Sequence, residues 1–196
     1  MAYVRPDARE FLARLARSPC CAAITIDDQL EPAIASGAEV LFILRGNGLE
    51  LPPVVRRIHD AGKLVAVHLD LVAGLRADRF GVAWLERSGV DGIITSHSQL
   101  IKTIKGEGVT AIQRLLLVRR SQLTTAIAAV SRATPDILEV LPGVILPGVT
   151  HLMPDFGVPL LAGGFVRTEE DARAIMAAGA LGITTSWQPL WGRALA

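Results

Sequence analysis

The stretch Leu160-Leu-Ala-Gly-Gly-Phe165, followed by a helix-like run and then by Leu181-Gly-Ile-Thr-Thr-Ser186, indicates how this chain folds. Each apolar run predicts a buried strand, and the acidic residues 169–171 between them predict the first turn of a helix. The first strand ends in the glycine pair Gly163-Gly164, and the second ends in hydroxyl residues. The pattern is that of two parallel strands joined by a crossover helix.

The ends of these two strands suggest an anion site. Parallel strands that end in glycines and hydroxyls can surround an anion with backbone N–H groups, because glycine lets a ligand approach the main chain. In (β/α)8 barrels the phosphate site commonly follows the last two strands. We therefore expect Gly163, Gly164, Thr185 and Ser186 to bind a phosphate group. The alternative is an ordinary βαβ crossover whose glycines only form tight turns.

Similar strand-like runs recur along the whole chain, with helical patterns between them. The runs are Cys20–Thr25, Val40–Leu44, Leu64–Leu69, Gly92–Thr95, Val109–Leu115, Ile137–Leu141, Val158–Ala162 and Leu181–Thr185. Because the strands are almost entirely apolar, they indicate a parallel sheet that helices cover. We predict a compact (β/α)8 TIM barrel that forms one domain over residues 1–196, with an amphipathic helix at residues 6–17 closing its bottom.

The composition of the 196-residue chain excludes several classes of protein. Its net charge of +1 gives no overall attraction to nucleic acid or to an acidic membrane. The chain has neither a membrane-spanning apolar run nor the apolar core of a signal peptide. The two cysteines, Cys20 and Cys21, are adjacent, a spacing that rarely supports a disulfide, so we expect small buried residues. We expect a cytoplasmic protein without membrane contact.

Polar side chains stand near the predicted carboxyl ends of several strands, where (β/α)8 barrels carry their chemistry. Alternation along the third strand turns His68 and Asp70 toward the barrel mouth, and Arg114 and Glu139 stand near the ends of two later strands. Buried charges are costly unless they are paired or bound to a ligand. We expect these four residues to bind the polyol end of a small phosphorylated ligand. The alternative is a mutual ion-pair network that fills the mouth without a ligand.

Several chemistries find little support in the sequence. The lysines, Lys63, Lys102 and Lys105, do not end predicted strands, so a Schiff-base aldolase mechanism fits poorly. A single histidine with carboxylates, as at His68, Asp70 and Glu139, is weak evidence for a metal. Neither a nucleotide-binding glycine motif nor a nucleophile elbow is present. We therefore expect no catalytic residue, no metal and no cofactor.

Several blocks of sequence are spread from about Cys20 to Trp191: KLVAVHLDLVAGL at 63–75, DGIIT at 91–95, QRL at 113–115, EVLPG at 139–143, AGG at 162–164 and TS at 185–186. In their order and spacing these blocks resemble the glycerol uptake operon antiterminator family. The resemblance implies a regulator that responds to glycerol 3-phosphate and, once liganded, binds leader mRNA and prevents termination of transcription of glycerol genes.

The chain departs from this family's pattern at His97, where lysine is usual, and at Arg119-Arg120, where an acid-serine pair is usual. Together with the resemblance, the added positive charges make Arg119 and Arg120 candidate RNA-binding residues. The alternative is a solvated helix face. The sequence shows no recognised RNA motif and no aromatic platform for stacking bases.

Other functions remain open at this point. One is a barrel enzyme acting on a small phosphorylated polyol or triose, with His68 as acid or base and Asp70 orienting it. Another is a sensor of phosphate ligands that works through a protein partner. Because Trp187 and Trp191 stand near Arg193 and a short barrel leaves apolar outer surface, we also expect a homodimer.

Overall fold

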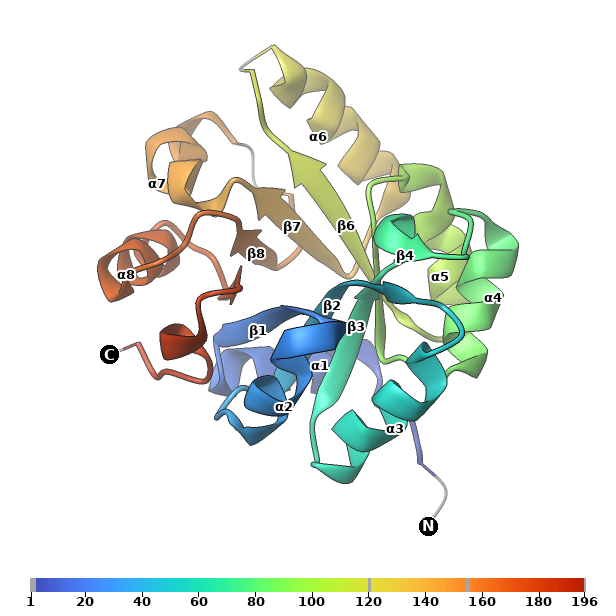
Figure 1. The fold of residues 1–196 in the computed structure, drawn as a ribbon. Coiled ribbons are helices and arrows are strands. Elements are labelled where there is room, and N and C mark those ends of the chain that lie inside the picture. Colours follow the sequence, from blue (N-terminus) through green and yellow to red (C-terminus); the bar gives the residue numbers. More distant parts are fainter. Residues whose placement is uncertain (1–2, 120, 154–155, 196) are drawn as a thin grey trace.

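Eight parallel strands close into a barrel because β1 pairs with both β2 and β9. The computed structural model describes residues 3–119, 121–153 and 156–195 (Figure 1). The barrel strands are β1 (Cys20–Thr25), β2 (Val40–Asn47), β3 (Leu64–His68), β5 (Gly92–Thr95), β6 (Thr110–Leu116), β7 (Ile137–Leu141), β8 (Leu160–Gly163) and β9 (Gly182–Thr185). The predicted (β/α)8 fold is confirmed.

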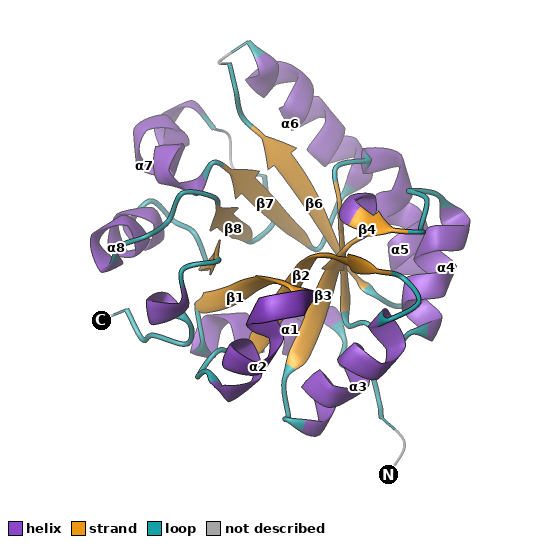
Figure 2. Ribbon diagram, viewed as in Figure 1, coloured by secondary structure: helices purple, strands orange, loops and turns teal. Residues whose placement is uncertain are grey.

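Helices cover the outside of the barrel, as Figure 2 shows. They are α2 (Ile26–Ala35), α3 (Leu51–Asp60), α4 (Arg79–Arg87), α5 (Ile101–Gly106), α6 (Gln122–Ala133), α7 (Leu146–Val149) and α8 (Glu169–Ala177). After β9 the chain forms only a short 3-10 turn, Gln188–Leu190. Among the described residues, none of the helices is both long enough and apolar enough to cross a membrane.

The alternation along β3 divides the core into an inner and an outer layer. Leu64 and Ala66 pack inside the barrel, while Val65 and Val67 pack in the outer layer with the helices. Since successive side chains of a strand point to opposite faces, His68 shares the inner face with Ala66. The predicted orientation of His68 is therefore confirmed.

Helix α1 (Ala8–Arg17) closes the bottom of the barrel, as predicted. Its Phe11 and Leu15 are fully buried among the inner side chains at the start of the strands. The Asp7 side chain caps the helix by accepting a hydrogen bond from the backbone N–H of Glu10. An added Cβ on Gly92 would lie 3.3 Å from the Phe11 ring, so this glycine leaves room for the helix.

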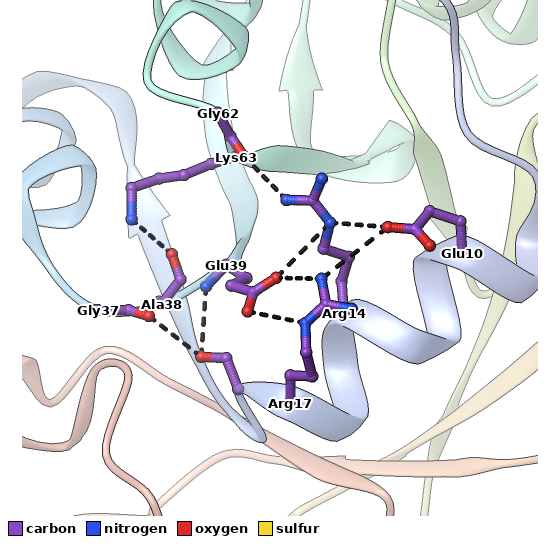
Figure 3. A network of polar contacts seen from close by, with 9 residues as sticks. Glu10, Arg14, Arg17, Gly37, Ala38, Glu39, Gly62 and Lys63 are labelled. Atoms are coloured by element: carbon purple, nitrogen blue, oxygen red, sulfur yellow. Dashed lines mark hydrogen bonds and ion pairs between the residues drawn. The ribbon is translucent and has the colours of Figure 1, made fainter.

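Charged side chains tie α1 to the bottom loops, as Figure 3 shows. Glu39 accepts hydrogen bonds from Arg17 and lies 3.6 Å from the Nε atom of Arg14, whose Nη1 atom donates to the Gly62 carbonyl. Lys63 donates to two backbone carbonyls of the same region, at 2.6 and 2.7 Å. Its ammonium group therefore belongs to the bottom of the barrel, as predicted, away from the strand ends that form the mouth.

Some element boundaries differ from the sequence prediction for identifiable reasons. Strand β2 continues to Asn47 because Gly46 and Asn47 pair with a short extra strand, β4 (Val72–Ala73). Strand β8 begins at Leu160, after Pro159, which has no N–H to donate to a neighbouring strand. Leu69 and Asp70 lie in a 3-10 turn, so Asp70 stands beyond β3.

Candidate anion-binding site at the barrel mouth

A pocket of about 410 Å³ opens at the carboxyl ends of the strands. Its lining residues are Ala23, Leu44, Arg114, Leu141, Gly164, Phe165, Val166, Arg167, Thr184, Thr185, Ser186 and Trp187. Within the described part of the chain, the lining includes two arginines and no carboxylate. Arg114 is paired with Glu139 beneath the pocket, and Arg167 adds a positive charge without an ion pair among the described residues, so the pocket favours an anionic ligand.

Three of the four expected phosphate-binding residues, Gly164, Thr185 and Ser186, line this pocket. Gly164 has a φ of +84°, a backbone conformation that glycine adopts without strain. Gly163 is buried beside Thr184, and a Cβ at Gly163 would lie 2.2 Å from the Thr184 hydroxyl oxygen. Gly163 therefore makes room for a neighbouring side chain, and Gly164 forms part of the pocket surface.

The Thr185 hydroxyl connects the loop after β8 to the turn after β9. It donates to the Val166 carbonyl at 2.7 Å and accepts from the Trp187 backbone N–H at 3.0 Å. Because its proton is committed to Val166, Thr185 positions the two loops. Ser186 is exposed, whereas Thr185 is buried, so the Ser186 hydroxyl is the more accessible to a ligand.

Below the pocket, Glu139 lies at the centre of a buried polar network. Only 1 % of its surface is exposed, and one carboxylate oxygen accepts from the Arg114 Nε atom at 2.8 Å. The other oxygen accepts from the Thr184 hydroxyl, also at 2.8 Å. Glu139 is thus paired within the protein, as the ion-pair alternative requires, while Arg114 also lines the pocket.

Asp70 is held by the turn after β5. One carboxylate oxygen accepts from the Thr95 hydroxyl at 2.6 Å, and the other accepts from the Ser96 backbone N–H at 2.8 Å. Asp70, Glu139 and His68 are not among the residues that line the pocket described above. Of the four expected polyol-binding residues, Arg114 alone faces that pocket.

The turns after β5 and β9 have the same geometry, which sequence reasoning had missed. Thr95 accepts from the His97 backbone N–H as Thr185 accepts from that of Trp187. Residues 88–101 and 178–191 align without a gap and share Gly, Gly, Ile, Thr, Ser and Leu, a signal that the sequence contains. In the turn after β5, the Asp70 carboxylate accepts hydrogen bonds from the Thr95 hydroxyl and the Ser96 backbone N–H. The corresponding residues after β9, Thr185 and Ser186, line the open pocket.

His68 lies buried near Arg114, and its Nδ1 atom has no hydrogen-bond partner among the described residues. Burial lowers its pKa from 6.5 to about 4, and the positive charge of Arg114 adds to the effect. Asp70 and Glu139 oppose the shift. His68 is therefore a neutral imidazole at physiological pH.

The lowered pKa of His68 predicts acid sensitivity. Because the folded state resists protonation, this group stabilises the fold above pH 6.5, and the stabilisation is lost as pH falls toward 4. Between pH 7 and pH 5 the loss should be about 2 kcal/mol. Urea unfolding of the wild type and of His68→Met at both pH values measures it, since the variant should lack this part of the decrease. Equal pH dependence in the two proteins would contradict the prediction.

The other predicted features lie as follows. Arg119 is exposed beside a small apolar pocket, whereas Arg120 lies outside the described residues. Cys20 and Cys21 are buried, as expected, and they form no disulfide. Across the described ranges, no group of three or more His, Cys, Asp or Glu side chains is arranged to hold a metal ion.

Comparison with known proteins places this geometry in a family. The model of the family described as "Glycerol-3-phosphate responsive antiterminator" matches residues 20–191. The uncharacterized protein YgcP of Escherichia coli is 30 % identical over 178 residues, which span 90 % of this chain and 93 % of YgcP.

Solved structures agree with this match. The glycerol uptake operon antiterminator regulatory protein of Listeria monocytogenes is 29 % identical with a TM-score of 0.83, over 88 % of this chain and 94 % of that one. A glycerol uptake operon antiterminator-related protein of Thermotoga maritima is 30 % identical with a TM-score of 0.80, over 90 % and 99 % of the two chains.

Three aldolases of solved structure are also similar, at 13–17 % identity and TM-scores of 0.68–0.71. Likeness at that level shows the shared barrel fold alone. The match over residues 20–191 covers nearly the whole barrel, including the pocket lining and the polar network beneath it. The chain therefore belongs to the glycerol-3-phosphate responsive antiterminator family.

Proposed function

We propose that this protein binds glycerol 3-phosphate in the mouth pocket and, when liganded, binds leader mRNA and prevents termination of transcription of glycerol-utilisation genes. Family membership supports this function, and the observation that carries the ligand site is the pocket lining. The phosphate lies against Gly164 and Ser186, where backbone N–H groups supply positive potential without a cofactor. Thr185 holds the two loops in place, and Gly163 makes room for the Thr184 side chain beside them.

The glycerol end of the ligand faces Arg114 and the polar network around it. Glu139 and Asp70 do not line the pocket, and Glu139 instead fixes the Arg114 guanidinium by accepting a hydrogen bond from its Nε atom at 2.8 Å. The remaining N–H groups of Arg114 can donate to the hydroxyl groups of the polyol. Neutral His68 is buried near Arg114, and its Nδ1 atom has no hydrogen-bond partner among the described residues.

The RNA-binding step predicts a salt-dependent interaction at Arg119 and Arg120. Glycerol 3-phosphate should raise the affinity for a glycerol-operon leader transcript, and replacing both arginines by glutamate should weaken binding. The dependence of affinity on salt should also become shallower, because fewer phosphate contacts release counterions. Filter-binding titrations at several salt concentrations, with and without the effector, measure both effects. Equal, weak binding by the free and liganded wild type at low salt would contradict the proposal.

The enzyme alternative has less support from the same geometry. Asp70 accepts its hydrogen bonds from Thr95 and Ser96, and within the described residues it makes none with His68, as an orienting role would need. His68, with a pKa of about 4, would be an acceptor of protons only and a weak one. Family membership also favours a regulator. Turnover of triose and polyol phosphates by the purified protein is the measurement that would restore this alternative.

The homodimer remains a proposal, and its sequence argument needs revision. Trp191 is buried and donates its indole N–H to the Thr185 carbonyl, so it does not supply exposed apolar surface. Exposed apolar side chains occur elsewhere, including Leu49, Phe80 and Trp84 near the ends of β2 and along α4. This outer surface is the better place for a second copy of the chain.

A further inference from the structure

Two exposed aromatic rings stand at the edge of the mouth pocket. Phe165 in the loop after β8 is 76 % exposed, and Trp187 in the turn after β9 is 47 % exposed. Both line the same pocket as Gly164 and Ser186. In the sequence, Phe165 directly follows Gly164 and Trp187 directly follows Ser186, the two residues that we assign to the effector phosphate.

The backbone at Phe165 is unusual for such a side chain. Its φ is 62°, in the left-handed region that bulky residues rarely adopt. The ring gains little from burial in return, because most of its surface meets solvent. Strain of this kind without compensating packing indicates a binding role for the loop.

A short chain of hydrogen bonds fixes the two ring-bearing loops relative to each other. The Val166 carbonyl accepts from the Thr185 hydroxyl, which in turn accepts from the Trp187 backbone N–H. Val166 and Thr185 are both buried, so this link is protected from water. The residues that carry the rings are therefore held in place before any partner binds.

The charge around the rings selects the partner. Arg114 and Arg167 line the same pocket; Arg114 is paired with Glu139, whereas the Arg167 guanidinium has no ion pair among the described residues and is the cation available to a partner. Exposed rings next to a cation are an arrangement by which proteins hold single-stranded nucleic acid, with bases on the rings and phosphate on the cation, here Arg167.

We propose that Phe165 and Trp187 stack on unpaired bases of the leader RNA, so that the loops that hold the effector phosphate also bind the RNA. This inference rests on the proposed RNA-binding function and gives it a location distinct from Arg119 and Arg120. The effector then acts locally, because its phosphate lies between the two loops. A protein partner on the same rings is the competing occupant, and the test below separates the two.

The test replaces each ring by leucine, which keeps apolar bulk but removes the π-face, in Phe165→Leu and Trp187→Leu. Affinity of the effector-loaded protein for the leader transcript and for short single-stranded oligo(U) should fall about tenfold per ring. The salt dependence should be unchanged, because stacking releases no counterions. Phe165→Tyr and Trp187→Phe should bind RNA as the wild type does. Phe80→Leu, at a ring on α4 that is 69 % exposed, is the matched control, and sedimentation of this variant checks that its association is unchanged, because Phe80 belongs to the proposed dimer surface.

The possible results separate this inference from the proposed function. If the wild type binds the leader and both leucine variants bind it equally well, the stacking site is wrong and the regulator stands. If the leucine variants lose glycerol 3-phosphate affinity to the same extent in calorimetry, the rings serve the effector, and the inference fails. If the effector-loaded wild type binds no leader RNA, both fail, and a protein partner becomes the better occupant.

Discussion

Replacing Gly164 by aspartate is expected to abolish glycerol 3-phosphate binding while the barrel stays folded. The new carboxylate would stand in the pocket lining, where the phosphate of the ligand is proposed to lie. A like charge placed against the ligand costs several kcal/mol, so affinity should fall about 100-fold or more. Calorimetric titration with glycerol 3-phosphate, glycerol and inorganic phosphate measures the loss.

The backbone at Gly164 requires a control, because its φ of +84° strains any other residue. Gly74 has a φ of +81°, and a Cβ added there would meet nothing within 4 Å. Gly74→Asp therefore introduces the same strain and charge in a loop outside the mouth pocket, and it should bind the ligand normally. Undiminished affinity in a folded Gly164→Asp protein would show that the phosphate lies elsewhere.

Removing Arg114 should destabilise the fold strongly. Glu139 is almost fully buried, and Arg114→Met would leave its carboxylate without the cation that lies 2.8 Å away. Breaking a buried pair from one side costs about 3–5 kcal/mol, since the remaining charge stays desolvated. Urea unfolding of the variant gives the value directly. Ligand affinity should fall as well, because Arg114 lines the pocket.

A surface pair of the same length provides the comparison. Arg173 and Glu169 on α8 are also 2.8 Å apart, but both are about half exposed. Arg173→Met should therefore change stability by no more than ~0.5 kcal/mol. The double variant Arg114→Met/Glu139→Leu should recover much of the lost stability, because no unpaired charge remains. A cost for Arg114→Met as small as that for Arg173→Met would show that water or other groups already compensate Glu139.

The sequence by itself determined the architecture of the barrel. Its eight apolar runs, the alternation of Val65 and Val67 against Ala66 and His68, and the amphipathic helix at the start all appear in the structure. These features follow from side-chain periodicity, which is a local property of the chain. The ends of the strands do not follow from periodicity, because the length of a β-strand depends on the strands with which it pairs, as the pairing of Gly46 with Val72 shows.

The sequence also indicated which residues gather at the mouth, but the tertiary structure decided how they are used. Asp70 was predicted from the sequence to face the polyol, and the structure shows that it anchors the turn at Thr95 and Ser96. Gly163 was predicted from the sequence to bind the phosphate, and the structure shows that it leaves space for Thr184. The rings of Phe165 and Trp187 gave no aromatic pattern in the sequence because they come from separate loops.

The physical reason is strand register. Arg114 lies opposite Glu139 on neighbouring strands, and Gly163 lies opposite Thr184, only once the barrel has closed with this pairing. The residues of the network are 25 and 45 positions apart in the chain. Local periodicity specifies the face on which a side chain lies, whereas its partner depends on how distant strands align. The sequence therefore determined the barrel and the polar residues at its mouth, and the closed sheet decided which of them are paired and which line the pocket.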